Sequence, residues 1–119
     1  DLPWEKIGIA HLTCNLMFKE GDAGWILRHL DEDRLLRVFD TLARAGAGIE
    51  LNASSLAGWQ SDPDTWLRPY RLARKTGCRF YSASDAHVLE NLGKISEVLP
   101  GVVAALDLTE RDRYRIPVA

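Results

Sequence analysis

The sequence lacks long apolar segments, an excess of positive charge and a cysteine framework. No apolar run approaches the roughly 18 residues that a membrane-spanning helix needs, and no charged start precedes an apolar segment as in a signal peptide. The chain has 15 Lys and Arg residues against 17 Asp and Glu, a formal net charge of −2. We therefore expect no membrane span and no nucleic-acid binding by bulk electrostatics, because the chain has no excess of basic residues to neutralise phosphates.

The two cysteines, Cys14 and Cys78, are far apart in the sequence and define no disulfide framework. We therefore expect a reduced, cytoplasmic setting. Cys14 is either a small buried residue or a thiolate ligand, and the sequence leaves both open.

With 119 residues, 46% of them hydrophobic and 27% charged, the chain has the composition of a globular domain with a modest core. It opens on Asp1 without an initiator Met, so we expect a piece of a longer protein.

Three short apolar stretches, residues 7–10, 48–52 and 78–81, have the length of strands and alternate with helical patterns. This order predicts an α/β fold with parallel strands and right-handed crossovers. Three parallel strands alone leave two open edges, and parallel sheets are normally covered on both faces. We therefore expect consecutive units of a larger β/α barrel or open sheet.

The helices are predicted from caps and apolar spacing. A long polar connection, residues 11–31, should lead into a helix that Asp31 or Asp33 caps and that ends near Gly46. A second helix should run from Asp62 to Gly77.

The last third of the chain predicts two further helical segments. One covers residues 89–99 and is interrupted by Pro100-Gly101; the other is a short terminal helix opened by Thr109-Glu110.

Polar residues stand at or just beyond the end of each predicted strand: His11, Glu50 with Asn52, and Asp85 with His87. Because the carboxyl ends of parallel strands meet at one edge of the sheet, we expect these side chains to share a site.

Asp85 and His87 form a D-x-H element, in which an extended backbone would point both side chains the same way. Mixed oxygen and nitrogen ligands suit zinc, manganese or iron. The alternative is that Asp85 caps the next helix and His87 lies in its exposed first turn.

The other polar residues also keep two interpretations. His11 is either a ligand or a half-buried strand-end residue. A carboxylate at Glu50 inside a buried strand needs a hydrogen bond, a cation or an outward path to an Arg. Asn52 either bonds a ligand residue or makes a turn. His29 is expected to be solvated.

The four tryptophans also keep more than one interpretation. Trp66 is expected in the core, while Trp25 and Trp59 are candidates for a pocket wall.

The segments Gly48–Ser54, with its E-x-N-x-S pattern, and Ser82–His87 resemble the PHP family, the polymerase and histidinol phosphatase domains. Gly8-Ile9-Ala10-His11 is similar to an earlier family strand that ends in a metal-binding His. The resemblance covers nearly the whole chain. It implies that residues 1–119 are the C-terminal portion of a single distorted (β/α)7 TIM-like barrel.

The resemblance further implies two or three divalent metal ions, zinc, manganese or iron, and hydrolysis of a small phosphate-ester substrate by a metal-activated water. Carried over residue by residue, His11, Asp85 and His87 match metal ligands, and Glu50 and Asn52 match a strand beside the site. Ala83 stands where the family usually has Gly.

The family's N-terminal H-x-H and its middle Glu and His ligands are absent, so the site is incomplete without the missing N-terminal half of the domain. We expect this chain alone to be inactive. The alternative is a non-catalytic or regulatory module that binds a protein or a nucleic-acid enzyme.

Overall fold

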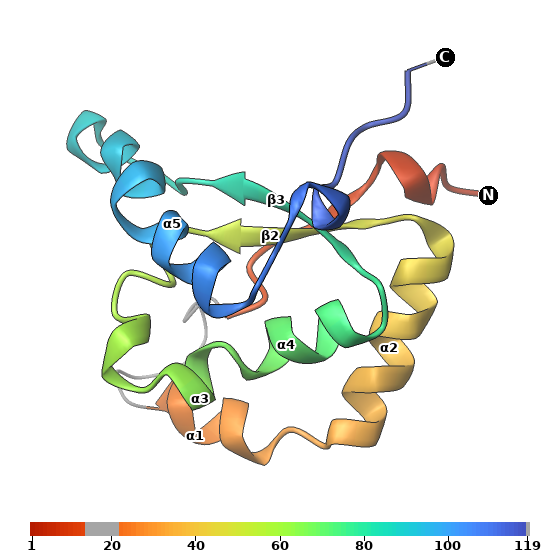
Figure 1. The fold of residues 1–119 in the computed structure, drawn as a ribbon, viewed down its shortest axis with the longest axis horizontal. Coiled ribbons are helices and arrows are strands. Elements are labelled where there is room, and N and C mark those ends of the chain that lie inside the picture. The colour runs from red at the N-terminus through yellow and green to blue at the C-terminus, as the bar shows by residue number, and fades with distance from the viewer. Residues whose placement is uncertain (14–21, 119) are drawn as a thin grey trace.

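A computed structural model describes residues 1–13 and 22–118. Its centre is a three-stranded parallel sheet of β1 (Gly8–Ile9), β2 (Gly48–Asn52) and β3 (Arg79–Ala83), in the order β1-β2-β3 (Figure 1). The predicted parallel α/β arrangement is thus confirmed. β1 is shorter than expected, and β3 runs two residues further than the apolar stretch 78–81.

The helices connect and flank these strands. They are α1 (Asp22–His29), α2 (Glu32–Ala45), α3 (Pro63–Trp66), α4 (Arg68–Lys75) and α5 (Lys94–Ala105), with short 3-10 turns η1 (Trp4–Lys6), η2 (Trp59–Ser61), η3 (Leu89–Gly93) and η4 (Glu110–Asp112). Among the described residues no helix is both long and apolar enough to cross a membrane.

Helix α1 corrects the prediction of a polar connection over residues 11–31. It buries only two apolar side chains, Ala23 and Leu27, and packs on α3 and α4. So short a helix is stabilised by its tertiary contacts. The sequence pattern was therefore too weak to predict it.

Helix α2 begins and ends as the sequence indicates. The Asp31 carboxylate accepts a 2.7 Å hydrogen bond from the backbone N–H of Arg34, which settles the cap on Asp31 instead of Asp33. Gly46 ends the helix in the left-handed conformation, at φ 78°, which glycine adopts without steric cost.

Replacing Asp31 by Ala should lower the free energy of unfolding by about 1 kcal/mol, because the first turn loses its side-chain cap. Asp33→Ala removes an acidic residue from the same turn without touching the cap, so it should cost only a few tenths of a kcal/mol. Urea unfolding of the two variants measures the difference, and equal losses would contradict a specific capping role for Asp31.

The predicted helix over residues 62–77 is divided. Asp62 caps α3 by accepting from the backbone N–H of Thr65, and hydrogen bonds from Thr65 hold the pKa of Asp62 below its usual value. The helix breaks at Leu67 and restarts as α4 at Arg68, the residue before Pro69. Pro69 lacks an N–H for the carbonyl four residues earlier, so a proline here favours the restart.

Helix α5 runs through Pro100, where the sequence predicted an interruption. Pro100 and Ser96 are both exposed. Water can therefore solvate the Ser96 carbonyl that a proline leaves without its helical donor, and the helix continues. The predicted terminal helix is confirmed only as the single turn η4, which Thr109 and Asp112 cap reciprocally.

The core lies on one face of the sheet. Ile9, Ile49 and Phe80 occupy one register position across the three strands and join a cluster with residues of α2, α4 and α5. Figure 1 shows α2 and α4 together beneath the sheet, with both chain ends on the other side. No helix among the described residues contributes to that second face. There Tyr81 lies over Gly8 and Tyr114 over Gly48.

Candidate functional site

The C-terminal ends of the three strands meet at one edge of the sheet, as the sequence predicts. His11 lies two residues beyond β1, Glu50 and Asn52 lie in the last part of β2, and Asp85 lies two residues beyond β3. Hydrogen bonds join all three ends, including one from the Ala53 backbone N–H to the Ala83 carbonyl at 2.8 Å. This edge is the candidate site.

The closest pair of potential ligands is His11 and Asp85. Nδ1 of His11 lies 3.9 Å from Oδ2 of Asp85, and both side chains are partly exposed, by 42% and 26%. The separation is too long for a hydrogen bond. The imidazole and the carboxylate therefore lie close together without a hydrogen bond between these two atoms.

Both residues adopt left-handed backbone conformations, with φ 59° at His11 and 54° at Asp85. Such a conformation costs a non-glycine residue roughly 1–2 kcal/mol. Asp107 also has a positive φ, but it directly follows Leu106, the C-cap of α5, where helices commonly end in this way. His11 and Asp85 lie beyond strands, where no helix end accounts for the positive φ, and the His11 backbone N–H is held by Glu50.

The Glu50 side chain is only 6% exposed, and its Oε2 atom accepts hydrogen bonds from the His11 backbone N–H at 2.7 Å and from Asn52 Nδ2 at 3.4 Å. In the described part of the chain it has no ion pair with Arg or Lys. The sequence left open a hydrogen bond, a bound cation or an outward path to an Arg for this carboxylate. The hydrogen bond is found, and the path to an Arg is not found among the described residues.

Asn52 is completely buried and makes the turn that the sequence left open, and it also bonds Glu50 instead of one of the proposed metal ligands. Its amide nitrogen donates to Glu50, and its amide oxygen accepts from the Ser55 backbone N–H at 2.9 Å in the turn after β2. The two bonds fix the amide orientation, because a flipped amide would lose both.

A chain of hydroxyl groups, which the sequence did not reveal, supports the same edge. Thr13 Oγ1 lies 2.9 Å from the Tyr70 hydroxyl and 3.1 Å from Ser55 Oγ. Ser54 Oγ donates to the Ser84 carbonyl at 2.7 Å. Tyr70 lies on α4, and no local pattern indicates that an apolar-face tyrosine reaches a strand end.

The Tyr70 ring is fully buried, and this burial raises its pKa from 10.0 to about 12. The hydrogen bond with Thr13 opposes the rise, and the negative charge of Glu50 adds to it. The hydroxyl is therefore protonated at neutral pH and can donate within the chain.

His87 is exposed and lies apart from the His11–Asp85 pair. Its Nδ1 is 3.0 Å from the Asp85 carbonyl oxygen. Since a carbonyl only accepts, Nδ1 is the donor in this contact, and Nε2 is the nitrogen that a neutral imidazole would offer to a metal. No group of three His, Cys, Asp or Glu side chains is arranged to hold a metal within residues 1–13 and 22–118.

Both predictions for the D-x-H element, same-side side chains and a helix cap, differ from the structure. Asp85 is left-handed instead of extended, so the two side chains need not point the same way. The capping alternative also fails, because the next helical turn begins at Leu89, has Val88 as its N-cap and has no side-chain cap.

Other residues singled out by the sequence lie elsewhere. Cys14 is outside the described residues. His29 is exposed, as expected, and its ring stacks on exposed Trp25 at 4.1 Å. Trp66 is half-buried and is not part of the core cluster, contrary to expectation, while Trp59 packs against that cluster.

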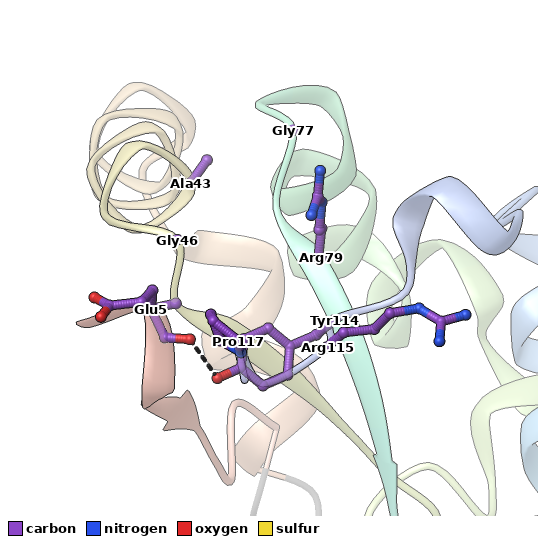
Figure 2. A pocket seen from close by; sticks show the side chains of 9 residues that line it. Glu5, Ala43, Gly46, Gly77, Arg79, Tyr114, Arg115 and Pro117 are labelled. Atoms are coloured by element: carbon purple, nitrogen blue, oxygen red, sulfur yellow. Dashed lines mark hydrogen bonds between the residues drawn. The ribbon is translucent and has the colours of Figure 1, made fainter. Parts of the chain in front are cut away.

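A hollow of about 320 Å³ lies at the opposite, N-terminal edge of the sheet (Figure 2). Arg79 points toward the turn at Gly77 that follows α4, Gly46 follows α2 on the other side of the hollow, and Tyr114 donates a 2.8 Å hydrogen bond to the Glu5 carbonyl. Helix C-termini carry partial negative charge, so Arg79 is well placed to stabilise them and an anionic ligand is not favoured.

Comparison of the chain with family models, with curated proteins and with solved structures finds no match.

Proposed function

We propose that this chain is the C-terminal portion of a metal-dependent phosphoesterase of the PHP type. The observation that carries the proposal is the approach of His11 Nδ1 to Asp85 Oδ2, 3.9 Å apart at the ends of two parallel strands. Strand-end residues of this kind are where β/α folds place their active sites. The sequence resemblance supplies the reaction class, and the geometry supports it.

The distribution of the helices supports the barrel assignment. The core unites α2, α4 and α5 with the same face of the sheet, and the strands follow one another without a reversal of order. A barrel places every helix outside and its strand-end polar residues toward the inside. Glu50 and Asn52 lie on the face without helices, which we assign to the barrel interior, and further strands would complete it.

The donor set fits a divalent transition metal. Two ligand atoms on a tetrahedral zinc lie about 3.4 Å apart, so the observed 3.9 Å needs only a small adjustment. An imidazole nitrogen and a carboxylate oxygen suit zinc, manganese or iron. His11 and Asp85 would hold one ion, and His87, through its free Nε2, is a ligand for a neighbouring ion. The remaining ligands would come from the other half of the barrel.

When bound, such ions polarise a phosphate oxygen and lower the pKa of a water molecule. The contribution of this chain is to present His11 and Asp85 in a fixed geometry, with Glu50 and Asn52 buried behind them. Because the strand-end edge carries partly exposed ligands, a small phosphorylated substrate can reach it.

Removal of the Asp85 carboxylate should weaken zinc or manganese binding by the full-length protein about tenfold or more, since one charged ligand is lost. Equilibrium dialysis with elemental analysis measures the affinity, and hydrolysis of a generic phosphate monoester measures activity, which should fall in parallel. His29→Ala is the matched control, because it removes an exposed imidazole on α1.

Unchanged affinity and activity in Asp85→Ala, with the control also unchanged, would refute the proposed site. A full-length protein that binds metal through Asp85 but hydrolyses no ester would favour the alternative, a non-catalytic module of the same fold.

A further inference from the structure

The end of β2 is the middle of the candidate site and makes hydrogen bonds to both of its neighbours. Toward β1, Glu50 accepts the His11 backbone N–H and Ser55 meets Thr13. Toward β3, Ser54 donates to the Ser84 carbonyl, next to Asp85. Both partners of the His11–Asp85 pair are therefore tied to the same strand.

The bond from His11 to Glu50 is the shortest of these ties to β1. A backbone N–H that donates to a carboxylate is charge-assisted, and such bonds are stronger than those between neutral groups. Glu50 is itself held in place, because Asn52 donates to the same Oε2 atom and is locked by Ser55 on its other side. The position of the Glu50 carboxylate is thus fixed by contacts that do not involve His11.

His11 needs such a tie because its backbone is left-handed at φ 59°. An L residue released from its partner relaxes toward negative φ. That change would rotate the Cα–Cβ bond and carry the imidazole away from Asp85. Thr13 anchors the chain two residues further on, but neither of its bonds reaches the His11 amide.

We infer that Glu50 is the positioning residue for His11: its buried carboxylate holds the His11 amide, fixes the left-handed backbone and so directs the imidazole at Asp85. The inference rests on the proposed metal site for its functional meaning. Glu50 touches neither metal nor substrate in this role.

The test compares Glu50→Ala with Glu50→Gln in the full-length protein. Gln keeps an oxygen that can accept from His11 and Asn52, and its amide nitrogen replaces the Oε1 atom, for which no protein partner is found in the described structure. Ala removes the acceptor. Cys78→Ala is the control for lost stability alone, since Cys78 is buried at the opposite edge of the sheet.

Two measurements are made on each variant: the His11 φ angle and His11–Asp85 distance in a crystal structure, and the affinity for zinc. Glu50→Ala should lose the positive φ and bind zinc about tenfold or more weakly, the scale seen when supports of metal ligands are removed. Glu50→Gln and Cys78→Ala should keep the positive φ and stay within about threefold of the parent affinity.

A left-handed His11 or an unchanged zinc affinity in Glu50→Ala would overturn the inference and leave Glu50 a structural residue. If the parent protein binds no zinc, the proposed function fails separately. The crystal structures then test the positioning role of Glu50 without zinc. His11 must still leave the left-handed region in Glu50→Ala and must remain in that region in Glu50→Gln.

Discussion

Raising the pH from about 9 to 12 is expected to remove about 2 kcal/mol of folding stability through Tyr70 alone. The buried phenol has a pKa of about 12 in the folded chain against 10.0 ordinarily. Above pH 10 the unfolded chain releases this proton while the folded chain retains it, so stability falls as the pH rises. The loss begins near pH 10 and approaches about 2.7 kcal/mol beyond pH 12, at 1.36 kcal/mol per pKa unit.

Tyr70→Phe isolates this contribution from other groups that titrate at alkaline pH. Burial also raises the pKa of Cys78 and of Tyr81, and both remain in the variant. At pH 8 the variant should be about 1 kcal/mol less stable, because it loses the bond with Thr13. By pH 12 it should be the more stable of the two. Urea unfolding across this range gives both curves, and a constant difference between them would contradict the expectation.

Replacing Gly48 by Ala should destabilise the chain by about 2 kcal/mol through overpacking. A Cβ at this position would lie 2.6 Å from Cγ of Tyr114, a contact that no side chain tolerates. Cγ lies on the axis about which the ring rotates, so turning the ring does not relieve the clash. The whole side chain must move, and its bond to the Glu5 carbonyl goes with it.

The same substitution in a Tyr114→Ala background should have the opposite sign. With the ring gone, Ala is favoured over Gly in a strand by about 0.5 kcal/mol. A double-mutant cycle by urea unfolding measures the coupling. Gly58→Ala is the control, since a Cβ there meets nothing within 4 Å. Additive effects of the two changes would show that the ring does not determine the need for glycine at 48.

The sequence predicted the location of the candidate site better than its construction. His11, Glu50, Asn52 and Asp85 could be assigned to one edge because parallel strands end on the same side. The sequence could not predict that Glu50 would accept a hydrogen bond from the His11 amide instead of pairing with an Arg. The residues of a strand do not indicate which distant loop will pack against them. The left-handed conformations of His11 and Asp85 were equally hidden, because neither is glycine.

Element boundaries show a similar division. Gly46 was readable as the end of α2 through its backbone freedom, while local patterns narrowed the start to Asp31 or Asp33 and the structure settled on Asp31. The passage of α5 through Pro100 was not, because it depends on whether the Ser96 carbonyl faces solvent. Helix α1 depends in the same way on the helices it packs against.

The sequence by itself therefore determined the parallel α/β order, the Asp62 cap of α3, the Gly46 end of α2 and the set of polar residues at the strand ends, since each follows from contacts between near neighbours or from strand direction. Tertiary structure alone decided which of those residues meet. It brought His11 within 3.9 Å of Asp85, left His87 outside the pair and placed Tyr70 beneath the site. These outcomes depend on backbone conformations and long-range hydrogen bonds between segments about 40 or more residues apart, which no local pattern specifies.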